Sequence, residues 1–280
     1  MLITIEGLTV HAPPINRDGL WAWAKMHVKR LAPAGKKPAF ALKNISCTFG
    51  HGITTVLGPN GAGKTMLLAI LAGLIPPDSG RTTIDGKVSG PEALRRITGY
   101  LPQTYGLYPQ LNAREILDYI ALLRGVVNIP NRAQRVENAL QQLGLMAVAE
   151  QKVGTYSWGM RQKVGIAQTL LDDSPVLVLD EPTAGLDAEE RNKLRQLLIQ
   201  IGQSRVVVWA SSLIADACCA DRVLILDRGD IRFWGTPAEL ARRIQSPADP
   251  LRAAMTGMNS LGPDLLEQGY RAILQAQVNT

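Results

Sequence analysis

The chain has 280 residues, of which 46% are hydrophobic and 19% charged, a composition typical of a globular protein with a sizeable core. No apolar run approaches the roughly 18 residues of a membrane-spanning helix, so an integral membrane protein is not expected. The formal net charge is +6, but residues 11–38 alone hold six basic side chains against Asp18, a local +5. The rest of the chain therefore has a net charge of only +1, which is too low for a general nucleic-acid-binding groove. No nucleic-acid partner is expected.

The first residues, MLITIEGLTV, alternate as a β-strand does and show no basic region followed by an apolar run, so no secretory signal is expected. The three cysteines, Cys47, Cys218 and Cys219, form neither a metal-ligand spacing nor an even disulfide framework. This cysteine usage favours a reducing compartment, the cytosol.

We interpret residues 11–38 as an insertion between the first two strands. The stretch GLWAWAKMHVKRLA places Trp23 and other apolar residues on one side of a basic helix. Such a helix lies on an anionic membrane surface, docks on a partner protein or packs against its own core. The sequence leaves all three interpretations open.

The strongest motif is in TTVLGPNGAGKTMLLAILAGL, residues 54–74, where an apolar strand pattern runs into a glycine-rich turn and then a helical pattern. The spacing G-x-x-x-x-G-K-[ST] in that context predicts a P-loop. Backbone N–H groups of such a loop cradle a β-phosphate, its lysine reaches the β- and γ-oxygens, and its threonine hydroxyl binds Mg²⁺. The predicted ATP-binding residues are Gly58, Pro59, Asn60, Gly61, Ala62, Gly63, Lys64 and Thr65.

A second half of this site is predicted in SPVLVLDEPTAGLD, residues 174–187. Residues 176–179 form the continuous apolar run of a buried parallel strand, and Asp180 and Glu181 follow at its carboxyl end, where open α/β sheets bind ligands. We expect Asp180 to hold Mg²⁺ through water and Glu181 to be the catalytic carboxylate that polarises an attacking water.

With YLPQ at 100–103, YSWGMRQKVGIAQTLL at 156–171 and AGLD at 184–187 added to these motifs, the chain resembles the ATP-binding subunits of ABC transporters. The resemblance covers about residues 40–240. It implies an α/β fold: a P-loop NTPase core with a mostly parallel sheet, an antiparallel β subdomain and an inserted helical subdomain at about residues 104–165. It also implies an ATP-binding domain over residues 1–240, followed by a C-terminal extension, residues 241–280.

The same resemblance implies roles for residues outside the P-loop. Gln103 matches a glutamine that contacts the metal and relays motion to the membrane partner, and Asp187 matches an aspartate that faces the opposite subunit. Ser157 and Gly159 match residues that bind the γ-phosphate held by the other subunit, in a homodimer or a heterodimer with another ATP-binding subunit. The implied Mg²⁺-binding residues are Thr65, Gln103 and Asp180.

Two helices are expected inside the insertion. NAREILDYIALLRG starts at Asn112 and has Glu115 at the N3 position of a capping box, and NRAQRVENALQQLG follows it with a similar apolar pattern. The apolar residues expected to pack in the core are Ile116, Tyr119, Ile120 and Leu123 in the first helix and Val136, Leu140 and Leu143 in the second.

Two residues depart from the family pattern. Trp158 places a large ring in the signature segment where a glycine lets the opposite subunit's nucleotide approach, unless the ring points away and packs at the dimer seam. Ser212 falls where the family carries a histidine, and a serine cannot supply imidazolium charge. Together these departures predict a degenerate site that binds ATP but turns it over slowly.

The aromatic residue that stacks on the adenine in this family has no clear counterpart. Ala34 and Lys36 occupy the matching zone, Phe40 lies late, and Trp23 reaches the site only if the insertion folds back. At the other end, SPADP opens the tail of residues 246–280, and PDLLEQGYRAILQAQ is expected to form a short helix, with a dimer contact as one possible role.

We therefore expect an ATPase subunit that energises an ABC transporter through separately encoded transmembrane permease subunits, at the cytoplasmic face of the cell membrane. GLYP and LNAREIL after YLPQ resemble the exporter-type branch of the family. The alternative is an ATP-binding regulatory or assembly subunit with little or no hydrolysis. Trp158 and Ser212 favour that alternative, and Glu181 opposes it. A soluble member acting on ribosomes or DNA lacks support, because neither tandem ATPase halves nor long coiled coils are present.

Overall fold

The computed structural model describes residues 1–11, 40–242 and 263–275, so the expected insertion lies outside it apart from His11, as do Trp23, Ala34 and Lys36. The strands are β1 (Ile3–His11), β2 (Phe40–Phe49), β3 (Gly52–Leu57), β4 (Ser79–Ile84), β5 (Lys87–Val88), β6 (Thr98–Leu101), β7 (Val176–Asp180), β8 (Val206–Ser211), β9 (Arg222–Asp227) and β10 (Asp230–Gly235). The α-helices are α2 (Lys64–Leu71), α3 (Pro91–Ile97), α4 (Ala113–Leu123), α5 (Ile129–Gln142), α6 (Trp158–Ala167), α7 (Ala188–Gly202), α8 (Pro237–Arg242) and α10 (Pro263–Gln275). Short 3₁₀ helices are η1 (Met146–Val148), η2 (Val153–Thr155), η3 (Gln168–Leu170) and η4 (Ile214–Cys219). Within these described ranges, no helix is both long and apolar enough to traverse a bilayer.

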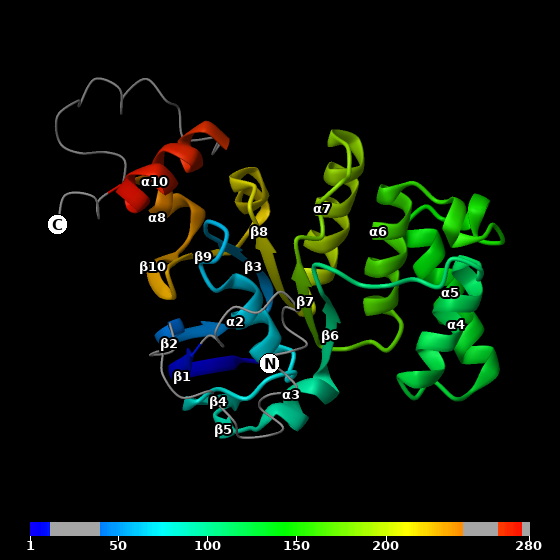
Figure 1. Cartoon of the computed structure of the whole chain (residues 1–280), viewed down its shortest axis with the longest axis horizontal. Coiled ribbons are helices and arrows are strands. Elements are labelled where there is room, and N and C mark those ends of the chain that lie inside the picture. Colours follow the sequence, from blue (N-terminus) through cyan, green and yellow to red (C-terminus); the bar gives the residue numbers. More distant parts are fainter. Residues whose placement is uncertain (12–39, 243–262, 276–280) are drawn as a thin grey trace, which may run out of the picture.

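A six-stranded sheet in the order β10-β9-β3-β8-β7-β6 runs through the middle of the molecule (Figure 1), and only the β10–β9 pair is antiparallel. Every residue of β7 and β8 is buried, as the continuous apolar run at 176–179 predicts for a strand covered on both faces. Val176 and Val178 pack with α2, whereas Leu177 and Leu179 pack with the helices on the other face. The alternation follows the two-residue period of a strand.

A second, antiparallel sheet has the order β2-β1-β4-β5. Its apolar residues Ile3, Ile5 and Phe49 belong to the same buried cluster as Leu67 and Leu71 of α2. Helix α2 therefore packs against residues of both sheets, and its first residue, Lys64, is held at a fixed place between them. The predicted fold class, with a mostly parallel sheet and an antiparallel β part, is confirmed.

Helices α4, α5 and α6 lie at the far end of the molecule from the antiparallel sheet (Figure 1). The predicted capping box at the start of α4 is confirmed: Asn112 Oδ1 accepts from the backbone N of Glu115, and Glu115 Oε2 accepts from the backbone N of Asn112. Helix α5 begins two residues before Asn131, because Asn128 caps it by accepting from the Asn131 backbone N. The subdomain boundary at residues 104–165 stays a prediction.

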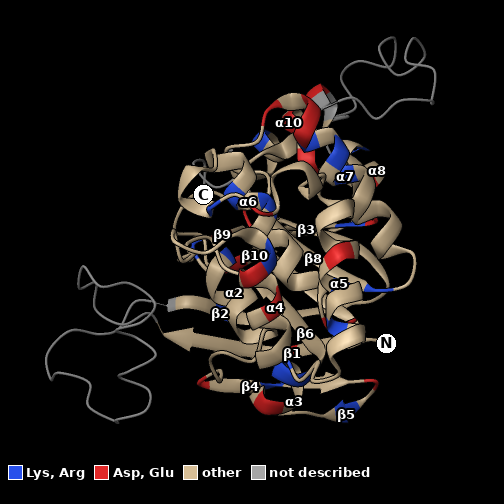
Figure 2. Cartoon of the chain, turned by 90° about the vertical axis from the view of Figure 1, so that its right-hand side faces the viewer, with Lys and Arg blue, Asp and Glu red and all other residues tan. Residues whose placement is uncertain are grey.

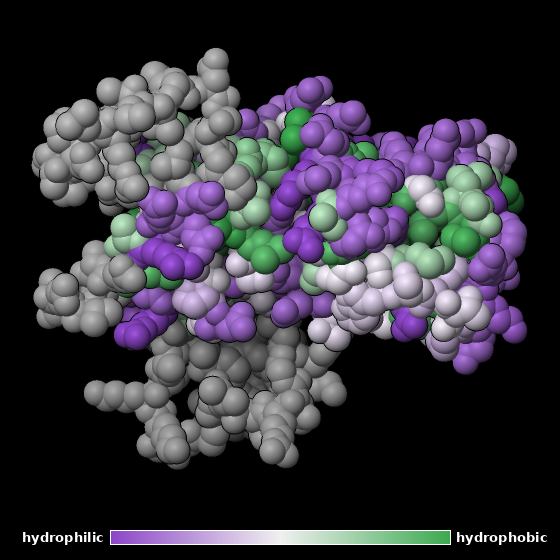
Figure 3. All heavy atoms as spheres, turned by 90° about the horizontal axis from the view of Figure 1, so that it is seen from above, coloured by the Kyte–Doolittle hydropathy of each residue, from purple (hydrophilic) through white to green (hydrophobic). Residues whose placement is uncertain are grey.

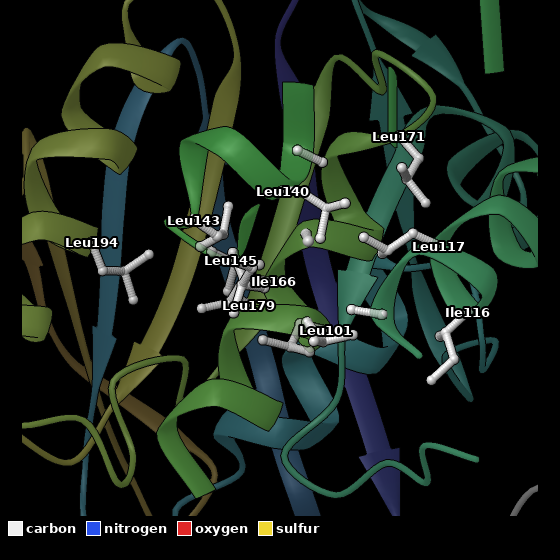
Figure 4. Packing of buried hydrophobic residues seen from close by; sticks show 14 of the residues in the cluster. Leu101, Ile116, Leu117, Leu140, Leu143, Leu145, Ile166, Leu171, Leu179 and Leu194 are labelled. Atoms are coloured by element: carbon white, nitrogen blue, oxygen red, sulfur yellow. The ribbon is translucent and has the colours of Figure 1, made fainter. Parts of the chain in front are cut away.

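The core under these helices differs in part from the expected one. Leu101, Ile116, Leu117 and Leu140 belong to one buried apolar cluster, part of which Figure 4 shows. Val136, Leu140 and Leu143 are buried as predicted. In α4, however, Tyr119 and Leu123 are exposed, so those two positions were predicted wrongly. The buried side of α4 consists instead of Ile116 and Leu117 together with the small side chains of Ala113 and Ala121.

The helix expected in the C-terminal tail is present as α10. Its Leu266 is fully buried with Ala217, Phe233 and Leu240, so α10 covers one end of this chain's own sheet. SPADP lies outside the described residues.

Figure 2 shows that basic and acidic residues are interspersed over the end of the molecule where α4 and α5 lie.

Candidate nucleotide-binding site

The P-loop, residues 58–65, joins the end of β3 to the start of α2. Gly63 adopts φ 105°, and an added Cβ there would lie 2.5 Å from the carbonyl oxygen of Ala41, so the turn requires glycine. The ammonium of Lys64 donates to the carbonyl oxygens of Gly58 at 2.6 Å and Pro59 at 3.4 Å. Burial lowers its pKa, against the opposing effect of Glu181 and Asp180. The carbonyl oxygens of the loop therefore hold the Lys64 ammonium within the P-loop. A cation beside the backbone amides of such a loop is what a phosphate site requires.

Asp180 is the last residue of β7 and is 1% exposed. Burial raises the pKa of its carboxyl group, and a hydrogen bond with the Thr65 side chain partly offsets that effect. Its Oδ2 is buried and, among the described residues, has no hydrogen-bond partner. A buried, unsatisfied carboxylate oxygen beside a threonine hydroxyl is a fit for Mg²⁺, which binds one or two protein oxygens together with substrate phosphates.

Glu181 follows Asp180 and adopts φ 53°, a left-handed conformation that a non-glycine residue rarely keeps without support. Its backbone N donates to the carbonyl oxygen of Ala210 at 3.0 Å. Its carboxylate Oε2 accepts from the hydroxyl of Ser212 at 3.2 Å. The structure therefore brings together Glu181, the predicted catalytic carboxylate, and Ser212, which is predicted to stand in place of a histidine.

Strand order explains why these groups meet. β8 lies between β3 and β7, and all three are parallel, so their carboxyl ends are side by side. β3 leads into the P-loop, β7 into Asp180 and Glu181, and β8 into Ser212. The predicted phosphate, metal and catalytic residues therefore occupy one edge of the central sheet.

Gln103 lies two residues beyond β6 and is exposed. It lines a pocket of about 180 Å³ between residues 103–109 and the start of α6, together with Tyr105, Trp158 and Gln162. The predicted role of Gln103 as a metal ligand stays a prediction.

Ser157 and Gly159 lie at the N-terminus of α6. Ser157 is the N-cap, and its hydroxyl oxygen accepts from the Met160 backbone N at 3.2 Å. Gly159 is buried, and a Cβ added to it would lie 3.0 Å from Glu190 Oε2 and 3.4 Å from Leu186 Cδ2. A side chain at this position would require Glu190 and Leu186 of the same chain to shift slightly. The roles of Ser157 and Gly159 toward a neighbouring subunit's nucleotide stay predictions.

Trp158 is 59% exposed, yet its ring has a fixed place in this chain. Its Nε1 donates to the carbonyl oxygen of Ala184 at 3.2 Å, and its ring covers the α-carbon of Gly185, where any added Cβ would collide with the indole. Gly185 has φ 75°, so glycine serves both conformation and contact. The ring is thus anchored on the loop between β7 and α7 of its own subunit.

Sequence reasoning missed several polar residues around Glu181. Gln162 is buried, and its Nε2 donates to the carbonyl oxygens of Glu181 at 3.4 Å and Pro182 at 3.3 Å. Tyr105 donates its hydroxyl to Gln162 Oε1 at 3.0 Å, and burial raises the pKa of Tyr105, which keeps that proton in place. The hydroxyl of Tyr105 was not singled out because nothing in its local sequence marks it.

A P-loop at the end of β3, with a buried aspartate and a glutamate at the end of β7, defines a P-loop nucleotide-binding protein with an α/β fold. The family model of the ABC transporter matches residues 42–184, which include the P-loop, the signature segment and the Asp180–Glu181 pair. The chain belongs to the ABC transporter family.

The chain is similar in sequence to two curated relatives. The probable multidrug ABC transporter ATP-binding protein YbhF of Escherichia coli is 36% identical over 214 residues, 75% of this chain. The linearmycin resistance ATP-binding protein LnrL of Bacillus subtilis is 33% identical over 215 residues, 75% of this chain and 68% of its own length. The matched region spans only 36% of the length of YbhF.

Among solved structures, a dimeric post-hydrolysis state of the ATP-binding cassette MJ0796, bound to ADP and Pi, aligns with a TM-score of 0.70. The alignment covers 84% of this chain and 98% of the cassette at 23% identity. At that identity the likeness shows the fold.

Proposed function

We propose that this chain binds ATP and hydrolyses it as the ATPase subunit of an ABC transporter. One observation carries the proposal: the buried ammonium of Lys64 and the unsatisfied Oδ2 of Asp180 lie at the same sheet edge as Glu181. Two buried charges with incomplete partners are costly in a folded chain unless a ligand completes them. A Mg²⁺-bound triphosphate supplies both the missing anion and the missing cation.

In this site, Lys64 binds the β- and γ-phosphate oxygens, and the amides of residues 58–65 orient the triphosphate at the start of α2. Thr65 and Asp180, with Gln103, hold Mg²⁺, which when bound neutralises charge on the phosphates. Glu181 orients the attacking water through its carboxylate, and the Ser212 hydroxyl fixes one of its oxygens. The relatives' names do not favour the regulatory alternative, since each describes a transporter ATP-binding or resistance ATP-binding protein.

We infer that transport takes place through separately encoded transmembrane permease subunits that bind this chain at the cytoplasmic face of the membrane. The described helices include no candidate span. Apolar side chains exposed in α4 and in the turn to α5 offer a docking surface, namely Tyr119, Leu122, Leu123, Val127 and Ile129. Figure 3 shows the face seen from above, where hydrophobic residues lie among hydrophilic ones.

We also propose that two ATP-binding subunits associate, as a homodimer or a heterodimer, so that Ser157 and Gly159 of one reach the nucleotide of the other. Ser157 and Trp158 are exposed at the N-terminus of α6, and this supports the association because the positive end of a helix favours an anion. The names of YbhF and LnrL, one a probable multidrug and the other a resistance protein, support export over import.

The signature segment and Ser212 support a lowered rate of hydrolysis. Trp158 lies at the start of α6, and its ring is anchored on Ala184. In that place the ring leaves less room for the nucleotide bound to the other subunit. Ser212 donates a neutral hydrogen bond where a charged imidazolium would act on the γ-phosphate. Binding through the P-loop is unaffected by either residue.

The test is a titration of the purified full-length chain with ATP, by calorimetry, with and without Mg²⁺, followed by a phosphate-release assay. We expect Mg²⁺-dependent binding and slow phosphate release. Absence of ATP binding would contradict the proposal. Binding without any release, in the presence of the membrane partner, would contradict the ATPase part alone.

A further inference from the structure

Asp216, in η4, is a fully buried carboxylate outside every motif of the site. Its Oδ2 accepts from the hydroxyls of Ser211 at 2.6 Å and Thr183 at 2.9 Å. Its Oδ1 accepts from Nε and Nη2 of Arg195 at 3.0 Å and 2.6 Å. A buried carboxylate is tolerated only when it is paired and hydrogen-bonded, and both oxygens of Asp216 meet that condition.

The two hydroxyls on Oδ2 come from the two loops that carry the reacting groups. Thr183 lies two residues after Glu181, in the loop that follows β7, and Ser211 lies one residue before Ser212, at the end of β8. Ser211 Oγ also accepts from the Leu213 backbone N at 3.0 Å, which fixes the turn that contains Ser212. One carboxylate oxygen thus ties both loops together.

Arg195 connects this arrangement to α7, the helix that starts where the loop after β7 ends. Its guanidinium also donates to Asn192 Oδ1 at 3.0 Å, one turn earlier on the same helix. Asp216 is therefore bound to α7 as well as to the two loops.

We propose that Asp216 is a positioning residue that holds Glu181 and Ser212 in their mutual geometry for ATP hydrolysis, a role that rests on the proposed ATPase function. Glu181 keeps a left-handed conformation, which persists only where the surroundings enforce it. The Thr183–Asp216 contact holds the loop two residues after Glu181, and Gln162 donates to the Glu181 and Pro182 carbonyls of the same loop. Because a displacement of about 1 Å can cost about a hundredfold in rate, the carboxylate position governs turnover.

Three substitutions in the full-length chain test this role. One changes the Asp216 carboxylate itself, and the other two remove the hydroxyls that donate to it. Asp216→Asn keeps the shape but removes the charge and places an amide N–H₂ among donors. Thr183→Val and Ser211→Ala each remove a single hydroxyl, from the Glu181 side and the Ser212 side. None of the three positions belongs to the P-loop or binds the metal.

Asp172→Asn is the matched control. Asp172 accepts from Arg124 Nη1 at 2.8 Å and from the Ser174 hydroxyl at 2.7 Å, so it repeats the acid–arginine–serine arrangement. It precedes β7, whereas Asp180 ends that strand and Glu181 follows it, so Asp172 lies at the opposite end of the strand.

Two readouts separate positioning from general stability: kcat with the calorimetric Kd for ATP, and amide hydrogen exchange of residues 181–187 and 211–213 without nucleotide. We expect Asp216→Asn and Thr183→Val to lower kcat by about tenfold to a hundredfold with unchanged Kd, and to speed exchange in both loops. Asp172→Asn should lower Tm without either effect.

The role is overturned if Thr183→Val and Ser211→Ala leave exchange and kcat at the wild-type level, or if Asp172→Asn changes both equally. These single-hydroxyl variants decide the matter even where Asp216→Asn does not fold. A wild-type chain that binds no ATP refutes the proposed ATPase function instead. The exchange comparison then still decides whether Asp216 holds the two loops.

Discussion

The hydroxyl of Ser212 donates a hydrogen bond to Oε2 of Glu181 at 3.2 Å, across the carboxyl ends of the neighbouring strands β8 and β7. The contact fixes one carboxylate oxygen and leaves the other to accept from water. It orients the predicted catalytic group, but it adds no positive charge beside the γ-phosphate. We therefore expect Glu181 to act as the base, while the neutral hydroxyl of Ser212 stabilises the charge of the transition state only weakly.

The P-loop lysine should decide ATP affinity. Lys64→Ala should weaken ATP binding at least tenfold, about 1.4 kcal/mol, because a charge-assisted contact with the phosphates is lost. Isothermal calorimetry measures the change. Lys193→Ala serves as the control, since Lys193 is exposed and pairs with Glu189 on α7. Equal affinities for the Lys64→Ala variant and the wild type would exclude the P-loop as the ATP site.

Hydrolysis should depend on the carboxylate of Glu181. Glu181→Gln keeps the size and the hydrogen bond with Ser212 but cannot polarise water as a carboxylate does, so phosphate release should stop while ATP binding persists. A phosphate-release assay beside calorimetry measures both quantities, and Glu189→Gln, on the exposed face of α7, is the control. An unchanged rate would assign the base to another residue.

The buried carboxylate of Asp180 should lower the free energy of unfolding and at the same time be needed for metal binding. Burial raises its pKa, so the folded state binds a proton more tightly than the unfolded state, and stability falls as pH rises between the unfolded and folded pKa values. At neutral pH, Asp180→Asn should therefore raise the free energy of unfolding by on the order of 1 kcal/mol. The same variant should lose the Tm increase that Mg²⁺ and ATP give the wild type.

Urea unfolding at pH 7 and thermal scans with ligand check both halves of the Asp180 prediction. Asp187→Asn is the stability control, because an asparagine caps α7 as well as Asp187 does. A less stable Asp180→Asn variant would show that the native carboxylate has a partner that offsets its burial.

The parts of the fold that the sequence predicts are those with a local signal. The P-loop, the buried run of β7 and the capping box of α4 each occupy a few adjacent residues whose pattern has one physical cause. The exposure of Tyr119 and Leu123 could not be predicted in this way. Both fit the apolar period of α4, but which side is covered depends on how α5 and α6 pack against it.

The same distinction applies to the site. Lys64, Asp180 and Glu181 are marked by motifs, whereas Gln162 and Asp216 are recognised only from contacts across 19 and 33 residues of sequence. The anchor of Trp158 on Ala184 and Gly185 is a further contact of this kind. Pairings of such separated residues follow from the order of the strands, which no local pattern contains.

The contact between Tyr105 and Gly165 should be visible in a double-mutant cycle. A Cβ at Gly165 would collide with the phenol ring of Tyr105, so Gly165→Ala should lower the free energy of unfolding by about 1–3 kcal/mol. In a Tyr105→Ala background the ring is absent, and the same change should stabilise α6 by about 0.5–1 kcal/mol. Chemical denaturation of the four proteins measures the cycle, and equal effects in both backgrounds would refute the contact.

The final prediction concerns Trp158 and Ser212, the two residues that the resemblance predicts to depart from the family pattern. Ser212→His should raise ATP hydrolysis in the assembled complex by supplying a charged donor at the γ-phosphate. Trp158→Gly should raise it by clearing the start of α6 of a ring now anchored on Ala184. A hydrogen bond to a charged group contributes roughly 1.5–3 kcal/mol, so partial recovery should still exceed about fivefold in rate.

The double variant then reports how the subunits pair. In a homodimer both residues address one nucleotide from opposite sides, so their effects on the rate should couple. In a heterodimer, substitutions confined to this chain act on different nucleotides, and their effects should multiply independently. Steady-state rates of the wild type, both single variants and the double variant give the coupling directly. If none of the three variants is faster than the wild type, the site is not degenerate: Ser212 then suffices in place of the histidine, and Trp158 serves to hold the loop before α7.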